Sequence, residues 1–227
     1  MTKFESFLVG QSRASRLLYV VARAIVVGVT RLFTRMRVEG AHRVPRHGAF
    51  VLAPVHRSYI DTPIAAAVTR RRLRFMGKDS LWKWKGPGWV LSALGGFPVS
   101  RGSADREALK RSVQVLEAGE PLVLFPEGER KSGSVVQPLF QGASYVAVKA
   151  GVPVVPVGIG GSERVMPKGV RFPRPRKVVV VVGEPIHPPL HAPGGRAPRE
   201  AVRDMSDRLY AELQRLFDEA DRAAGVR

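Results

Sequence analysis

Short apolar runs alternate with helical patterns along most of the chain, which predicts an α/β layer fold rather than a helical bundle. The apolar runs predict strands at 49–53, 72–77, 121–125, 152–159 and 177–182. Between and after them, apolar residues spaced three or four apart predict helices at 103–119, 143–150 and 198–222. Ser103 is the expected cap of the first of these helices, Gly119 and Gly151 are stop signals, and Pro198 opens the last one.

The amino-terminal segment, residues 14–36, predicts an amphipathic helix. One face carries apolar residues at helical spacing: Leu18, Val21, Ile25, Val29, Leu32 and Met36. The opposite side carries four arginines within roughly 80° of one another: Arg13, Arg16, Arg23 and Arg31. The longest uncharged run, 24–30, is shorter than the ~20 apolar residues of a bilayer crossing, and no signal-peptide cleavage pattern follows. The pattern predicts either a helix lying in a membrane interface or one packed on the protein's own core.

Composition and charge narrow the partners. A length of 227 residues fits one domain with a real core, and 37 Lys and Arg against 19 Asp and Glu give a formal net charge of +18. Such a charge favours polyanions: nucleic acid, anionic lipid headgroups, or phosphorylated and CoA-type substrates. The absence of cysteine excludes disulfides, thiolate metal sites and a cysteine nucleophile, and it is compatible with a reducing cytosol.

All three tryptophans, Trp82, Trp84 and Trp89, lie in one short window interleaved with lysines. Trp beside Lys suits a membrane interface, although the same mixture can stack bases. No helix-turn-helix, zinc-finger or ribonucleoprotein-type motif accompanies it, so we expect no nucleic-acid partner. His187 and His191 sit in a Pro-rich connector without carboxylate or Cys partners, which indicates loop residues rather than metal ligands.

Four polar blocks follow predicted strands, where α/β folds usually place their sites. His56 and Asp61 could form a base with its orienting carboxylate, or merely cap the next helix. Arg101 lies between flexible glycines in Gly96–Gly102, and Phe125-Pro126-Glu127-Gly128-Glu129-Arg130 ends a very apolar run. The fourth block, Val152–Val157, contains two prolines and therefore predicts an edge strand or a strand interrupted where something binds.

In order and spacing, these four blocks resemble the glycerolipid acyltransferase family, particularly its bacterial 1-acyl-sn-glycerol-3-phosphate members, over roughly residues 38–187. The resemblance implies an α/β fold with a central mixed sheet flanked by helices. It also implies an amphipathic, membrane-associating helical segment at 1–37 followed by an acyltransferase domain at 38–227. Two residues depart from the family pattern: Glu129 stands where Thr is common, and Gln141 where Lys is frequent. A carboxylate at 129 beside Arg130 would partly offset a phosphate-binding charge, which bears on the acceptor.

The resemblance also implies roles for individual residues. His56 would act as the general base and Asp61 would orient it. Lys78, Arg101 and Arg130 would grip the acceptor's phosphate. Glu127, beside Gly128 in the substrate-binding block, would bind an acceptor hydroxyl or lock one of these cations, and backbone amides near Pro98 and Val99 are candidates for the oxyanion hole. No metal and no cofactor are implied beyond the co-substrate, acyl-CoA or acyl carrier protein.

The implied reaction moves a fatty acyl group to the free hydroxyl of 1-acyl-sn-glycerol-3-phosphate, giving phosphatidic acid in phospholipid biosynthesis. The expected location is the cytoplasmic face of the cell membrane, with the chain peripheral or monotopic on an anionic surface. Three alternatives stay open: another lyso-lipid or glycolipid acceptor, an inactive basic peripheral membrane protein, and a metal-dependent hydrolase built on His56, Asp61, Glu127 and Glu129. The chain has no Gly-x-Ser-x-Gly elbow, which argues against a serine hydrolase of that type.

Overall fold

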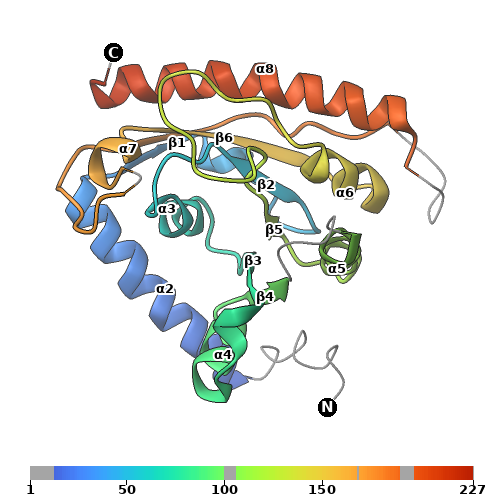
Figure 1. Cartoon of the computed structure of the whole chain (residues 1–227), viewed down its shortest axis with the longest axis horizontal. Coiled ribbons are helices and arrows are strands. Elements are labelled where there is room, and N and C mark those ends of the chain that lie inside the picture. Colours follow the sequence, from blue (N-terminus) through green and yellow to red (C-terminus); the bar gives the residue numbers. More distant parts are fainter. Residues whose placement is uncertain (1–12, 100–105, 168, 190–196, 227) are drawn as a thin grey trace.

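The structure is a computed structural model that describes residues 13–99, 106–167, 169–189 and 197–226 (Figure 1). Three residues singled out from the sequence, Arg101, Ser103 and His191, lie outside these ranges.

Seven strands form one mixed sheet in the order β1-β7-β6-β2-β5-β3-β4. Their bounds are β1 Arg37–Glu39, β2 Val51–Pro54, β3 Arg74–Lys78, β4 Gly96–Val99, β5 Leu122–Val123, β6 Val154–Gly160 and β7 Val179–Val182. Neighbouring strands pair in parallel except β6 and β7, which run antiparallel. The expected central mixed sheet flanked by helices is therefore confirmed.

Helices cover both sides of this sheet. They are α2 Arg13–Thr34, α3 Asp61–Ala67, α4 Lys85–Ala93, α5 Arg106–Glu117, α6 Gly142–Ala150, α7 Ser162–Val165 and α8 Arg199–Ala224, with short 3-10 turns η1 Ala41–Arg43 and η2 Asp79–Trp82. In Figure 1, α8 spans one side of the sheet, and α2 and α3 lie on the other. The helix α6 packs against α8 and the strands β2 and β6, and α5 packs against α6.

Two glycines let α8 approach the sheet at backbone distance. A Cβ atom added at Gly158 would lie 2.3 Å from the carbonyl oxygen of Leu216, and one at Gly160 would lie 2.2 Å from the carbonyl carbon of Ala220. Any side chain at these positions of β6 would force the helix away. The apolar face predicted for this helix, including Leu209, is buried against the sheet as expected.

The strand with two prolines is interior rather than an edge. β6 pairs with β2 on one side and β7 on the other, so the expectation of an edge strand was wrong. Pro156 lies between the end of the β7 ladder at Val157↔Val182 and the isolated bridge Val154↔Ile186. Its carbonyl oxygen accepts from the Gly183 amide, and its missing N–H falls in the gap between ladder and bridge. A proline is tolerated there because no ladder bond is required from it.

The amino-terminal helix α2 docks by its polar side. Four of the six residues of its predicted apolar face are exposed, among them Ile25, Val29 and Leu32 with 61%, 62% and 84% of their surface accessible, while Leu18 and Met36 are half-buried. The docked side holds Tyr19, Arg23 and Val27. The Tyr19 hydroxyl accepts from the Leu73 amide at 3.2 Å, and Arg23 Nε donates to the Ala66 carbonyl at 3.1 Å. The alternative in which the apolar face packs on the protein's own core is therefore wrong.

By length and composition, Arg16–Thr34 is long and apolar enough to cross a membrane, and little of it is buried against the protein. The sequence expectation considered only uninterrupted uncharged runs and so missed this. One such helix is weak grounds for a span. Arg23 is also held to carbonyls of the protein body, as an interfacial helix would allow.

Candidate active site

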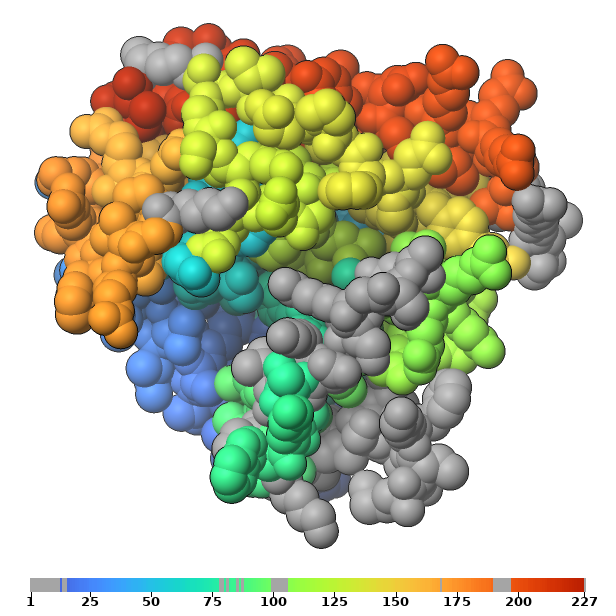
Figure 2. All heavy atoms as spheres, viewed as in Figure 1, coloured from blue at the N-terminus to red at the C-terminus, as the bar shows by residue number. Residues whose placement is uncertain are grey.

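The sheet order brings the polar blocks to one edge. β2, β5, β3 and β4 are adjacent and parallel, so the segments that follow them emerge at the same carboxyl edge. His56 follows β2, the Phe125–Arg130 block follows β5, and Lys78 ends β3. In Figure 2 the cyan segment that follows β2 reaches the surface between the yellow-green and orange segments of the later chain. This edge is the candidate active site.

His56 and Asp61 form a hydrogen-bonded pair. His56 Nδ1 lies 3.0 Å from Asp61 Oδ2, and the two side chains are 16% and 0% exposed. With Nδ1 donating to the carboxylate, the other ring nitrogen, Nε2, is left as the proton acceptor. The arrangement suits a general base with a fixed tautomer.

The carboxylate of Asp61 is fixed by the turn before α3. Its Oδ2 atom also accepts the backbone amides of Arg57 and Ser58, both at 2.6 Å. Asp61 is the first residue of α3, and the capping position, Ile60, has no side-chain bond. The simple helix-cap alternative is therefore wrong, because this carboxylate bonds the preceding loop and the imidazole. The buried Oδ1 atom has no hydrogen-bond partner among the described residues.

An aromatic ring supports the imidazole from the neighbouring strand. His56 stacks on Phe125 with ring centroids 4.0 Å apart and planes 22° from parallel. Phe125 belongs to the block after β5, which pairs with β2. The stacking fixes the plane of the ring, a role that the sequence analysis did not assign to Phe125.

Glu127 is buried and bound to Arg57. Arg57 Nη1 donates to both carboxylate oxygens of Glu127 at 2.7 and 2.8 Å, and the two side chains are 1% and 0% exposed. Glu127 also accepts the backbone amides of His56 at 3.1 Å and of Gln137 at 3.0 Å. Through these bonds it ties the loop of the histidine to the segment after the Phe125–Arg130 block.

Arg57 completes a buried polar network. Its guanidinium donates to the carbonyls of His56, Gly133 and Val135 and lies 4.8 Å from the ring centroid of Phe217 on α8. From the sequence, Glu127 was expected to bind an acceptor hydroxyl or to lock one of the phosphate-gripping cations, and no role was expected for Arg57. An arginine directly after a histidine, two residues beyond the apolar Val55, was the available signal, since a buried charge needs a partner.

Arg130 lies over Tyr59 at the same edge, with its guanidinium carbon 3.3 Å from the ring centroid. Its Nη1 atom is buried and has no partner among the described residues. A donor held in this way is prepared to bind an anion. The preceding Gly128 has φ +72°, and a Cβ there would lie 2.7 Å from the Phe140 ring, so the turn requires glycine.

The other predicted site residues are placed only partly. Lys78 ends β3 and pairs with Val99 of β4, and its side chain is not among those described. Glu129 is ion-paired with Lys131 at 2.8 Å on the surface. Gln141 directly precedes α6, makes no side-chain capping bond and is exposed.

Within the described part of the chain, no group of three or more His, Cys, Asp or Glu side chains could hold a metal ion. The described connector residue, His187, is exposed.

The chain resembles known proteins in sequence and structure. It matches the family profile described as Acyltransferase over residues 35–160. It is 26% identical over 189 residues to the 1-acyl-sn-glycerol-3-phosphate acyltransferase of Bacillus subtilis, covering 82% of this chain and 90% of that protein. It is 31% identical over 125 residues to the lyso-ornithine lipid O-acyltransferase of Pseudomonas aeruginosa, covering 55% of this chain and less than half, 46%, of that protein.

A solved structure is also similar. The crystal structure of the 1-acyl-sn-glycerophosphate acyltransferase PlsC from Thermotoga maritima superposes with a TM-score of 0.66 at 27% sequence identity, covering 94% of this chain and 86% of that one. The fold shared with that structure is the mixed sheet with its flanking helices.

Proposed function

The chain belongs to the acyltransferase family, and from this membership we propose that it transfers a fatty acyl group to the free hydroxyl of 1-acyl-sn-glycerol-3-phosphate, giving phosphatidic acid. The donor is an acyl thioester, acyl-CoA or acyl carrier protein. The observation that carries the proposal is the His56–Asp61 pair at 3.0 Å, placed at the carboxyl edge beside Arg130. The Bacillus and Thermotoga relatives, named for this reaction, support the choice of acceptor.

In this proposal, His56 Nε2 removes the proton of the acceptor hydroxyl as that oxygen attacks the thioester carbonyl. Asp61 holds Nδ1–H and stabilises the imidazolium that forms. The tetrahedral intermediate collapses with loss of the thiolate, which takes up the proton. A thiolate leaves readily, so a single base with good positioning suffices and no acyl-enzyme is needed.

Arg130 is the proposed grip on the acceptor's phosphate, supported by its buried and unpartnered Nη1 atom. Lys78 and Arg101 are proposed as further cations of this grip. Gly128 would let the chain turn beneath the phosphate. For Glu127 we propose a positioning role, since its carboxylate already binds Arg57, His56 and Gln137. No metal and no cofactor take part in the proposed step.

The proposed location is the cytoplasmic face of the membrane, with the chain peripheral or monotopic. The exposed face of α2 supports this location. So do two exposed tryptophans, Trp84 directly before α4 and Trp89 within it, because α4 contacts α2. These apolar side chains would enter the acyl boundary, while the +18 charge attracts anionic headgroups. The lyso-lipid acceptor is then presented to the site from the same surface.

A second acceptor is favoured by a separate observation. Glu129 stands where the family commonly has Thr, and the matched Pseudomonas relative is named for a lyso-ornithine lipid rather than a phosphate acceptor. A cationic headgroup would compete with Lys131 for the carboxylate of Glu129, whereas a phosphate would be repelled by that carboxylate.

The test gives the purified full chain a panel of acceptors with acyl-CoA and acyl carrier protein donors. We expect transfer to lysophosphatidic acid and a loss of about 10³-fold in kcat/KM for His56→Ala. His47→Ala is the matched control, because His47 is exposed and lies before β2. Transfer that persists in His56→Ala would refute the base, and transfer only to lyso-ornithine lipid would replace the acceptor.

A further inference from the structure

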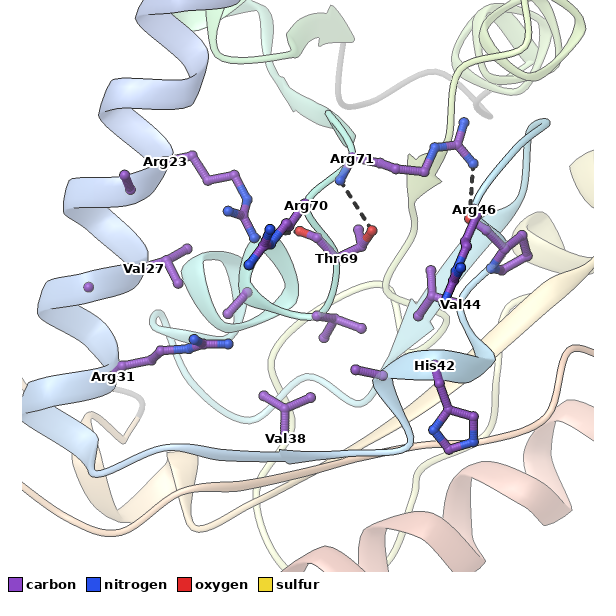
Figure 3. Close-up of a pocket in the computed structure, with 16 residues that line it drawn as sticks. Arg23, Val27, Arg31, Val38, His42, Val44, Arg46, Thr69, Arg70 and Arg71 are labelled. Carbon is purple, nitrogen blue, oxygen red and sulfur yellow. Dashed lines mark hydrogen bonds between the residues drawn. The ribbon is translucent and has the colours of Figure 1, made fainter.

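A cavity of about 750 Å³ lies between α2 and the body of the protein, away from the candidate active site. Its walls come from α2, from residues 38–46 and from the end of α3 with the segment after it (Figure 3). The helix α3 begins at Asp61, beside His56, and ends at Ala67, on the cavity wall. Its seven residues separate the two places by ~10 Å.

The cavity lining is strongly cationic. Five arginines and one histidine line it, with no aspartate or glutamate among the lining residues: Arg23, Arg31, Arg46, Arg70, Arg71 and His42. In Figure 3 the side chains of Arg23 and Arg31 reach from α2 toward the segments that carry Arg70 and Arg46. Like charges gathered in one concave site are stabilised when an anion binds between them.

Two of these cations are held rigidly without being neutralised. Arg71 Nη1 donates to the carbonyls of Gly48 at 2.6 Å and Pro45 at 3.2 Å, and Arg23 donates to the carbonyls of Ala66 and Thr69. Burial lowers the pKa of Arg71, and the carboxylate that opposes this, Glu120, is ion-paired with Arg74. Carbonyl partners orient a guanidinium but leave its positive charge available.

The other three cations are free to bind. Arg31, Arg46 and Arg70 are exposed, and none of their side chains has a hydrogen bond or ion pair among the described residues. A planar guanidinium matches a phosphate group bidentately. Between the cations the walls are apolar, with Val27, Val44 and Val68 among them, which suits the carbon atoms next to a phosphate ester.

The position of α2 indicates that a phosphate bound in this cavity would belong to a lipid headgroup. Its outward face is the exposed apolar stripe with Ile25, Val29 and Leu32, and its inward face lines the cavity. An interfacial helix sinks ~5–10 Å into the acyl boundary, which is about its own diameter, so its inward face lies at headgroup depth. We propose that this cavity is a second, non-catalytic site that binds the phosphate headgroup of an anionic glycerophospholipid.

The test uses the full chain with soluble dihexanoyl phosphatidic acid, read by hydrogen exchange and by titration. We expect protection of amides in 41–46 and 67–71. We also expect Arg31→Gln/Arg70→Gln to weaken binding at this site roughly tenfold or more. The matched control is Arg13→Gln/Arg16→Gln, which removes the same charge from exposed positions on α2 outside the cavity lining. Neither pair includes the structural Arg23 or Arg71, and thermal unfolding checks that both variants are folded.

Three results would overturn the inference: protection confined to the segment around His56, equal losses in the two double variants, or inorganic phosphate binding the cavity as tightly as the lipid. The first would assign the lipid to the active site, the second would indicate general surface charge, and the third would exclude a lipid source. The readouts do not depend on turnover. A chain that shows cavity binding but transfers no acyl group would refute the proposed reaction and leave this site standing.

Discussion

The helices α2 and α8, of 22 and 26 residues, carry the same kind of apolar repeat, but the protein buries this repeat in α8 and leaves it exposed in α2. α8 buries its repeat, Leu209 and Leu213 included, against β6 and β7. α2 leaves Ile25 and Leu32 exposed and docks through Tyr19 and Arg23 instead. The comparison teaches that a repeat locates an apolar face but not what covers that face. In α8 the cover is the protein's own sheet, and in α2 we propose that it is lipid.

Among the substitutions that test this difference between α8 and α2, we expect the largest effect from Phe217→Ala on α8. Phe217 is 3% exposed and lies beneath the Arg57 guanidinium, so its loss removes core packing and support for the site. We expect the free energy of unfolding to fall by about 4 kcal/mol. We also expect kcat to fall at temperatures where the variant is folded. Phe172→Ala, at an exposed position, is the control, and an unchanged kcat per folded molecule would limit Phe217 to packing.

Leu213→Ala and Leu32→Ala form a matched pair on the two helices. Leu213 is fully buried, and its truncation should lower the free energy of unfolding by about 3 kcal/mol in denaturant titrations. Leu32 is 84% exposed, and its truncation should change that quantity by less than about 0.5 kcal/mol. It should instead reduce retention on anionic vesicles by roughly tenfold. A large loss of stability in Leu32→Ala would mean that the protein itself covers α2.

Substituting a glycine beneath α8 and one within α2 should change the free energy of unfolding with opposite sign. Gly160→Ala places a Cβ against the α8 backbone at 2.2 Å, so we expect a loss of about 2 kcal/mol. Gly28→Ala meets nothing within 4 Å and improves helix propensity, so we expect a gain of about 0.5 to 1 kcal/mol. Thermal unfolding measures both. A stable Gly160→Ala would show that α8 can slide away from β6 at little cost.

The smallest effect concerns the docking of α2. Arg23→Gln removes bonds to the carbonyls of Ala66 and Thr69 and should cost about 1.5 kcal/mol. Arg16→Gln, on the same side but exposed, should cost less than about 0.5 kcal/mol. Hydrogen exchange of α2 reads this difference directly, because a loosened helix exchanges faster. Equal exchange in both variants would show that Arg23 does not anchor the helix.

Local patterns predicted much of the fold. The expected helix at 143–150 is α6, and its stop signal Gly151 adopts the left-handed conformation with φ 66°. Buried strands were located at 49–53 and 177–182 within a few residues. The short helix α4 was not predicted, since it contains Gly86 and Pro87, and α3 entered only as the helix that His56 and Asp61 could have capped. β4 was taken for a binding loop, because Gly96 and Pro98 weaken the strand signal.

In the candidate site, too, some contacts could be predicted from the sequence and others required the tertiary structure. His56 and Asp61 lie five residues apart, so the sequence could suggest their pairing once the other polar blocks were considered. The partnership of Arg57 with Glu127 joins residues seventy positions apart and required the pairing of β2 with β5. The contacts of Phe125 with His56 and of Tyr59 with Arg130 also depend on the pairing of these two strands.

The sequence by itself determined the periodicity of each element, the order of the four polar blocks and the family, because these are properties of neighbouring residues and their spacing. Only the tertiary structure decided which face of α2 is exposed, that β6 is an interior strand, and that Glu127 pairs with a buried arginine. Each of these depends on contacts between distant segments. A sheet order and the approach of a helix to glycines at 158 and 160 fix such contacts, and no local pattern encodes them.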